Sequence, residues 1–170
     1  MENYKIVEPA KLDDNMIKLI GKEWMLISAG DSDKFNTMTA NWGSIGFYAN
    51  KPIATIFVRP ERYTFDFVEE SDCFTLSFFG DSQREALALL GKVSGRDCDK
   101  VAEAGLSPIF TEKGNPAFSQ ARMVLECRKI YGHNMSKDDF IDQEIFSNCY
   151  TRGGVHKMYM AVIENCYVRE

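Results

Sequence analysis

Six segments with the character of β-strands are spread over the whole chain and limit the folds that it can adopt. They are rich in β-branched and aromatic residues, which favour strands, and they end at clusters of Gly, Pro, Asn or Asp. The segments are 22–29, 36–42, 53–59, 73–79, 122–131 and 156–168. Between the second and third segments we expect a Gly-rich, Pro-containing connection, because Gly43, Gly46, Asn50 and Pro52 lie there.

Short helices are expected between these strands. Ser82 begins a capping box, and apolar residues at helical spacing follow it as far as Gly91. A second capping signature begins at Ser94 and predicts a helix through Ala104. A third short helix is expected over Thr64–Glu70, with its first residue as the N-cap. Many strands interrupted by small helices favour a mainly β fold, a β-barrel with peripheral α-helices, over a doubly wound sheet.

The size and charge of the chain exclude several classes of protein. Its 170 residues fit a single domain, 1–170, and its formal net charge of −5 argues against a nucleic-acid binder. We expect no secretory leader and no membrane span, because no apolar stretch approaches the ~20 residues that cross a bilayer. Five cysteines without a Cys-x-x-Cys pair indicate reduced thiols in a cytoplasm. Two histidines are too few for the common metal sites, so no metal is expected.

The segment Asn36–Gly46 is the first candidate binding site. Asn and Thr side chains interleave there with Met, Ala and Trp. Amides at the end of a strand can bond the heteroatoms on the edge of a planar aromatic ligand, while Trp42 or Met38 covers its face. The other interpretation is a half-exposed strand whose Trp belongs to the core. The residues alone leave both interpretations open.

A second candidate site lies directly before the expected helix at Thr64. Arg59 and Arg62 bracket a Pro-Glu pair there. Helix N-terminal amides favour anions and arginine matches the geometry of phosphate, so the segment can form a phosphate cradle without a Gly-rich loop. Alternatively it is a solvated turn in which Glu61 offsets the two arginines.

Several single residues outside these segments could also have a binding or catalytic role. Lys100 can reach a second phosphate oxygen or a ring carbonyl, although such a lysine is more often on the outer face of a helix. Cys98 can be a reactive thiol or a passive one. His156, after a pair of glycines, can orient a substrate or donate to a ring, although a lone histidine is usually structural. Glu126 and Arg128 lie two apart on one face of a strand and are expected to be surface or interface charges.

Taken in order, these segments resemble the flavin reductase-like, FMN-binding split-barrel family, and within it the flavoredoxin-like branch. The resemblance extends from about Trp24 to Tyr167. The segments that carry it are Asn36-Thr37-Met38-Thr39-Ala40-Asn41-Trp42, Arg59-Pro60-Glu61-Arg62-Tyr63-Thr64, Ser94-Gly95-Arg96-Asp97 with Lys100, Leu125-Glu126-Cys127-Arg128-Lys129-Ile130-Tyr131 and His156-Lys157-Met158-Tyr159.

The resemblance implies a six-stranded split β-barrel that forms a homodimer and binds one FMN per subunit close to the dimer interface. The family pattern would place the isoalloxazine edge and its surroundings at Asn36, the backbone of Thr37, Met38 and Thr39, and Trp42. It would place the phosphate and ribityl region at Arg59, Arg62, Tyr63, Thr64 and Lys100. An acidic residue often stands shortly before the histidine of the family, whereas Gly153 and Gly154 occupy this stretch here. That difference leaves the catalytic role of His156 open.

The activity implied by the resemblance is that of an FMN-dependent flavin reductase. NADH or NADPH would pass a hydride to flavin N5, and the electrons would move on to an acceptor that the sequence does not identify. The flavin carries this chemistry, so the scarcity of histidine does not count against it. A flavoredoxin-type electron carrier is the alternative, because no nicotinamide-binding motif is present. A third hypothesis is a split-barrel module for haem or another small ligand, since two histidines and an apolar barrel could suit an axial ligand.

Overall fold

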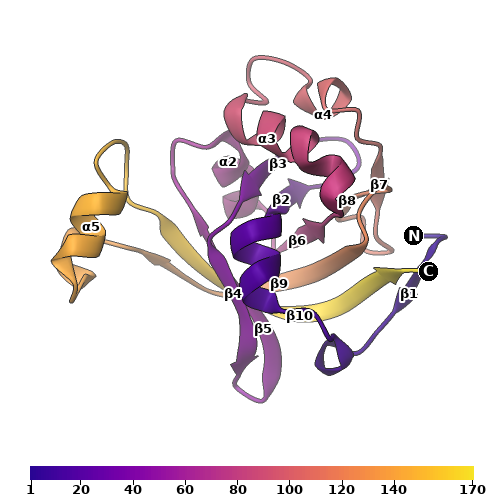
Figure 1. The fold of residues 1–170 in the computed structure, drawn as a ribbon, viewed down its shortest axis with the longest axis horizontal. Helices are drawn as coiled ribbons and strands as arrows, with labels where there is room; N and C mark the ends of the chain where they lie inside the picture. Colours follow the sequence, from indigo (N-terminus) through magenta and orange to yellow (C-terminus); the bar gives the residue numbers. More distant parts are fainter.

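The six expected strands are all present and pair antiparallel in one sheet of the computed structural model, which describes residues 1–170 (Figure 1). They are β2 (Met25–Gly30), β3 (Phe35–Ala40), β5 (Lys51–Val58), β6 (Cys73–Phe78), β9 (Met123–Asn134) and β10 (Lys157–Arg169). Two further strands, β1 (Tyr4–Ile6) and β4 (Gly43–Tyr48), bring the sheet to eight strands. The expectation of a mainly β fold with peripheral helices is confirmed, and the sheet has two strands more than the expected six.

The stretch expected as a Gly-rich connection is the strand β4, so that expectation was wrong. β4 pairs with β5 through a two-residue turn at Ala49 and Asn50, whose φ angles are 51° and 58°. Two consecutive positive φ angles give the turn that matches the twist of a hairpin. A Cβ on Gly43 would lie 2.8 Å from the carbonyl oxygen of Thr55. This glycine therefore permits the close approach of two strands instead of interrupting one.

The order of the strands explains where the barrel is split. The order is β3-β2-β6-β9-β10-β5-β4, so the sheet begins and ends with strands that follow each other in the sequence. Only Asn41 and Trp42 connect them. The free edges of β3 and β4 therefore meet at this connection, and β3 has a strand partner on one side only.

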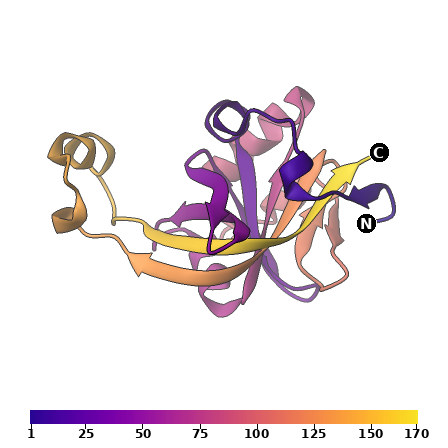
Figure 2. The ribbon, with the colours of Figure 1, turned by 90° about the horizontal axis from the view of Figure 1, so that it is seen from below.

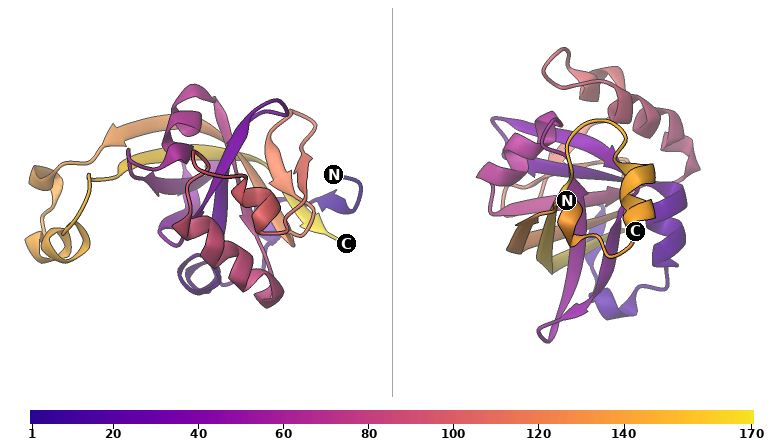
Figure 3. Two further views of the ribbon diagram at one scale, coloured as in Figure 1. Left: turned by 90° about the horizontal axis from the view of Figure 1, so that it is seen from above. Right: turned by 90° about the vertical axis from the view of Figure 1, so that its left-hand side faces the viewer.

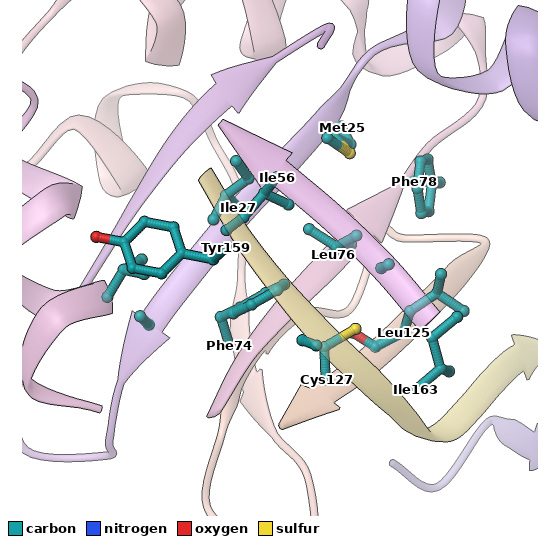
Figure 4. Packing of buried hydrophobic residues seen from close by; sticks show 14 of the residues in the cluster. Met25, Ile27, Ile56, Phe74, Leu76, Phe78, Leu125, Cys127, Tyr159 and Ile163 are labelled. Carbon is teal, nitrogen blue, oxygen red and sulfur yellow. The ribbon is translucent and has the colours of Figure 1, made fainter. Parts of the chain in front are cut away.

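Apolar side chains on the two faces of the sheet form two clusters. Figure 4 shows the larger one, which fills the barrel and includes Ile27, Ile56, Leu76, Leu125 and Tyr159. The smaller one lies on the other face, where Leu26 packs with Leu87 and Leu90 of α3 (Arg84–Lys92). Neighbouring residues of β2 thus point to opposite clusters, as the alternation of a strand requires. This packing fixes α3 beside the edge strand β3.

The helix caps differ from the sequence-based expectation. The helix α2 (Tyr63–Glu70) begins one residue early with Arg62 as its N-cap, and Thr64 is buried in its first turn. Before α3, a 3₁₀ turn (Asp81–Gln83) replaces the capping box expected at Ser82, and α3 has no side-chain cap. Tertiary contacts thus override the local capping preference at both helices.

The next helix and the first expected strand are also shorter than predicted. The helix α4 is limited to Lys100–Glu103, and its cap is Asp99, which accepts the Ala102 N–H at 3.1 Å. Ser94 caps no helix, because its hydroxyl accepts the Arg96 N–H at 3.2 Å in a local turn. Ahead of β2, a π-helical turn (Leu19–Glu23) takes the residues expected to begin the strand.

An arm projects from one end of the barrel (Figures 2 and 3). β9 and β10 continue beyond the other strands and are joined by 135–156, which contains the helix α5 (Gln143–Cys149). The short elements η1 (Pro9–Lys11), α1 (Met16–Lys18), η4 (Lys137–Asp139) and the hairpin of β7 (Pro108–Phe110) with β8 (Pro116–Phe118) complete the chain. None of the helices is both long and apolar enough to traverse a bilayer.

Glu126 in β9 is fully buried, so the expectation of a surface charge was wrong for this residue. Its carboxylate accepts hydrogen bonds from the hydroxyl of Thr111 and from the amides of Asn115 (2.7 Å) and Asn165 (2.6 Å). The segment around Thr111 covers this part of the strand, which a periodicity argument does not reveal. Arg128 lies beyond the cover and is exposed, where it pairs with Glu164 at 2.5 Å.

Candidate functional site

Two hollows meet at Thr39, Ala40 and Asn41, where β3 ends. The first has a volume of about 370 Å³, and we call it the Trp42 cleft; its other lining residues are Met38, Trp42, Phe57, Arg59 and His156. The second, of about 290 Å³, lies toward α3 and is bordered by Trp24, Leu87, Ala88, Gly91 and Lys92. Because the outer edge of β3 is unpaired, its backbone N–H and C=O groups are free to bond a ligand between these hollows.

The side chains of β3 are largely engaged within the protein. Asn36 is buried, and its Nδ2 donates to Oγ1 of Thr64 at 2.9 Å. The hydroxyl of Thr37 accepts from Ser28 at 2.8 Å and turns into the sheet. The hydroxyl of Thr39 donates to the carbonyl oxygen of Leu87 at 2.5 Å. Thr37 and Thr39 can therefore offer a ligand their backbone groups only.

A third hollow of about 90 Å³ gathers positive charge, and we call it the cationic hollow. Arg62, Lys92 and Lys100 border it together with Glu61, Tyr63, Thr64, Val93 and Ser94. The Arg62 guanidinium donates to the Gly91 carbonyl at 3.0 Å, and Nζ of Lys100 lies 3.3 Å from the Val93 carbonyl. None of the three cations forms a salt bridge with a carboxylate.

The electrostatics of the cationic hollow favour an anion. Lys100 is only 4% exposed, and burial, followed by the charge of Arg62, lowers its pKa to about 8. Burial and the charge of Arg59 lower the pKa of Arg62 in the same direction. Desolvated like charges destabilise one another, and a bound anion would remove this repulsion. The residues present therefore fit a phosphate group.

Arg59 and Arg62, expected together at one phosphate, have different surroundings. Arg59 donates to the carbonyl oxygens of Arg152 (2.6 Å) and Cys149 (3.0 Å) in the arm, and it borders the Trp42 cleft. Tyr63 stays at the cationic hollow, with its ring 4.5 Å from the Arg96 guanidinium. The structure thus brings Arg62, Tyr63, Thr64 and Lys100 together and places Arg59 with Trp42 and His156.

His156 stands in the Trp42 cleft. Its ring lies 5.1 Å from that of Trp42, and its Nδ1 is 2.9 Å from the hydroxyl of Tyr150. Burial, followed by the charge of Arg59, lowers the pKa of His156 to about 4. The imidazole is therefore neutral at pH 7 and can donate or accept a single hydrogen bond at Nε2.

The sequence pattern did not identify Tyr150 or the true role of Glu61. The carboxylate of Glu61 accepts the N–H of Gly154 and thereby ties the arm to the segment before α2. A Cβ on Gly154 would lie 2.9 Å from this carboxylate, so a larger residue would require the Glu61 side chain to shift. The consecutive glycines 153 and 154 were the available signal for this close approach.

The fold is a split antiparallel barrel, and its free edge strand lies next to the cationic hollow. These two features define a class of protein, the split-barrel proteins with a site for an anionic ligand. The chain belongs to the flavin reductase like domain family, whose model matches residues 18–170. This membership confirms the resemblance inferred from the sequence.

Solved structures of this family share the fold. An FMN-binding domain of a flavin reductases-like enzyme from Shewanella baltica is 19% identical, with a TM-score of 0.71 over 98% of this chain and 78% of the other. Flavoredoxin from Methanosarcina acetivorans is 22% identical, with a TM-score of 0.68 over 96% and 77%. An NADH:FAD oxidoreductase from Streptomyces globisporus is 17% identical, with a TM-score of 0.63 over 87% and 74%. The curated protein sequences contain no significant match.

Proposed function

We propose that the protein binds FMN and acts as an NAD(P)H-dependent flavin reductase. The observation that carries this proposal is the presence of two cations without a carboxylate partner, Arg62 and Lys100, beside the free edge of β3. A charged phosphate and a planar ring with a polar edge are the chemistry that these two features accept. Family membership and the FMN-binding relative from Shewanella baltica support the same ligand.

In this proposal the cofactor lies along β3. Arg62, Tyr63, Thr64 and Lys100 serve the phosphate and ribityl region, and Lys92 and Ser94 also border the hollow there. The ring meets Asn36, the backbone of Thr37, Met38 and Thr39, and Trp42. Arg59, which the family pattern assigns to the phosphate region, borders the Trp42 cleft, and His156, the candidate catalytic residue, lines the same cleft.

When bound, FMN supplies the redox chemistry by taking a hydride from NADH or NADPH and passing the electrons to an acceptor. The protein contributes binding and electrostatics. Lys100 and Arg62 provide positive charge at one end of the site, and Arg59 provides it at the other. Trp42, Met38 and Phe57 provide apolar surface to the cleft.

The visible spectrum of the purified protein tests FMN binding. We expect a yellow protein, or a colourless one that gains a flavin absorption band when FMN is added. A protein that shows no flavin band after incubation with FMN and removal of the excess would contradict the proposal. Mass spectrometry of the extracted ligand would also decide against haem if it finds FMN alone.

An electron carrier without its own NAD(P)H activity is the second candidate function. The structural likeness to a flavoredoxin favours it, whereas the likeness to an NADH:FAD oxidoreductase favours the reductase. Mixing the FMN-loaded protein with NADH or NADPH under anaerobic conditions separates the two. Rapid bleaching of the flavin excludes a pure carrier, and bleaching only by a protein donor excludes the reductase.

We also propose that two copies associate as a homodimer. Large apolar side chains of the arm are exposed, among them Tyr131, Ile141 and Ile145, and such groups commonly mark an interface. Light scattering during gel filtration measures the mass and distinguishes a dimer from the 19.4 kDa monomer. The single domain over 1–170 and the cytoplasmic location remain predictions, and the five free cysteines are consistent with a reducing compartment.

A further inference from the structure

A cavity of about 570 Å³ lies between the start of β3 and the segment 95–108, and it is larger than the Trp42 cleft. We call it the Cys98 pocket, after the cysteine in its wall. It shares no residue with the Trp42 cleft and only Lys100 with the cationic hollow. Sites for small molecules commonly have volumes of about 300–1,000 Å³, so the pocket is large enough for a second ligand.

Part of the wall of the Cys98 pocket is apolar and mainly aliphatic. Phe35, Val101, Leu106 and Pro108 line it, and Leu106 is only 4% exposed. The Phe35 ring is held by an edge-on contact with the ring of Phe110 at 5.9 Å. A ligand with a hydrocarbon body would remove this surface from water, which favours binding.

Two buried polar side chains, Lys100 and Asn36, interrupt the apolar wall. The Lys100 ammonium has three N–H donors, and the carbonyl oxygens of Leu90 and Val93 accept two of them at 3.4 and 3.3 Å. No carboxylate pairs with this ammonium. The Asn36 amide donates one of its two N–H groups to Thr64 at 2.9 Å. Each side chain therefore keeps one N–H donor for a ligand.

The other charged residues of the Cys98 pocket are exposed. Asp97 and Asp99 line its solvent side, and Asp99 is engaged as the cap of α4. The Arg96 guanidinium pairs at 2.7 Å with Asp66, which does not line the pocket. The buried charge is thus the single positive charge of Lys100. A ligand with one negative charge matches it, whereas the second charge of a phosphate would be repelled by the two aspartates.

We propose that the Cys98 pocket binds a small monocarboxylate with an aliphatic body. Its carboxylate accepts hydrogen bonds from Lys100 and Asn36, and its hydrocarbon part lies against Phe35 and Leu106. Because Lys100 also borders the cationic hollow, this ligand and a phosphate in the hollow compete for the same ammonium. The pocket and its ligand class follow from contacts within the chain, and only the competition with FMN rests on the proposed function.

Cys98 is a built-in reporter of the position of the ligand. It lines the pocket, whereas the other half-buried thiols, those of Cys73 and Cys149, do not. Alkylation by N-ethylmaleimide, followed by mass spectrometry of the peptides, measures all three in one sample of the parent protein. We expect hexanoate to slow the modification of Cys98 several-fold and to leave the other two rates unchanged. An unchanged rate at Cys98, or equal slowing at all three thiols, would overturn the site.

Calorimetric titration with hexanoate, 1-hexanol and hexylamine tests the chemistry of the pocket. We expect hexanoate to bind about 10-fold more tightly than the alcohol, because a charge-assisted hydrogen bond is added, and the amine to bind most weakly. Lys100→Met should remove the advantage of hexanoate. Lys92→Met is the matched control, because Lys92 borders the cationic hollow but not the Cys98 pocket, and it should keep the advantage. An alcohol or amine that binds as tightly as hexanoate would overturn the carboxylate assignment.

Titration of FMN with and without saturating hexanoate tests the competition. Hexanoate should weaken FMN binding about 5-fold or more, and FMN should weaken hexanoate binding by the same factor, because coupling between two sites is reciprocal. Riboflavin, which lacks the phosphate, should show little coupling. If no FMN binds and hexanoate still protects Cys98, the proposed function fails and the pocket stands. If FMN binds equally well with and without hexanoate, the shared use of Lys100 is wrong.

Discussion

Arg62 and Lys100 bond neighbouring carbonyl groups at the C-terminal end of α3. The Arg62 guanidinium lies 3.0 Å from the Gly91 oxygen, and Nζ of Lys100 lies 3.4 Å from the Leu90 oxygen. The end of a helix carries partial negative charge, which stabilises nearby cations without neutralising them. Two full positive charges therefore remain available to a ligand in the cationic hollow.

Replacing Lys100 should weaken the binding of FMN far more than the binding of riboflavin. A charge-assisted hydrogen bond contributes about 1.5–3 kcal/mol, so Lys100→Met should weaken FMN binding by roughly 10- to 100-fold. Riboflavin lacks the phosphate and should lose far less affinity. Isothermal titration of both ligands measures the difference. Arg59→Ala is the comparison, because its guanidinium borders the Trp42 cleft and should affect both ligands alike. Equal losses for Lys100→Met would place the phosphate elsewhere.

The same lysine should make stability depend on pH in the ligand-free protein. The pKa of Lys100 falls from 10.5 to about 8 on folding. Between these pH values the unfolded chain binds more protons than the folded one, so the free energy of unfolding rises with pH. Relative to Lys100→Met, the parent protein should gain roughly 3 kcal/mol from pH 8 to pH 10.5. Urea unfolding of both proteins at several pH values measures this gain, and parallel curves would contradict it.

FMN binding should quench the fluorescence of Trp42 more than that of Trp24. The chain has only these two tryptophans, and each borders one of the two hollows at the end of β3. Trp24 is also covered by the Arg84 guanidinium, 3.2 Å from its ring. We expect Trp42→Phe to lose most of the FMN-dependent quenching and Trp24→Phe to retain it. The reverse result would place the flavin ring on the α3 side of β3.

Glu126 should matter far more to stability than Arg128, although both belong to β9. Removing a buried carboxylate leaves the amides of Asn115 and Asn165 without their acceptor, so Glu126→Ala should cost about 3 kcal/mol or more. The exposed pair of Arg128 with Glu164 should contribute at most about 1 kcal/mol. Chemical denaturation of Glu126→Ala and Arg128→Ala compares the two, and similar losses would contradict the assignment.

The strands were predictable because their pattern depends on neighbours in the sequence. All six expected strands are present, with ends that differ by up to three residues. β4 was missed because glycine usually interrupts a strand, whereas Gly43 here allows a close approach to Thr55. The cap predicted at Ser94 was wrong because Asp99 caps α4 instead. The cap predicted at Ser82 was wrong because packing against the sheet sets where α3 begins. The local capping preference of about 1 kcal/mol is too small to oppose this packing.

The site was predictable where its residues are adjacent in sequence. Arg62, Tyr63 and Thr64 come from one segment and border one hollow. The burial of Glu126 and the bond between Tyr150 and His156 depend on contacts with other segments and on the path of the arm. Nothing in their immediate neighbours marks them. The orientation of Arg59 toward the arm was equally unpredictable, because it depends on contacts with Cys149 and Arg152 far away in the sequence.

The two-residue connection between β3 and β4 limits how the protein can exchange a ligand. Three Cα–Cα steps separate Ala40 from Gly43, so these ends stay within about 11 Å of each other whatever occupies the space beside them. The short connection between β3 and β4 therefore sets an upper limit on how far the barrel can open at this point. The other border of the Trp42 cleft depends on the arm, whose backbone is bonded by the side chains of Arg59 and Glu61. The width of the cleft on this side therefore depends on how firmly the arm is held, whereas the short connection limits the width on the side of the barrel.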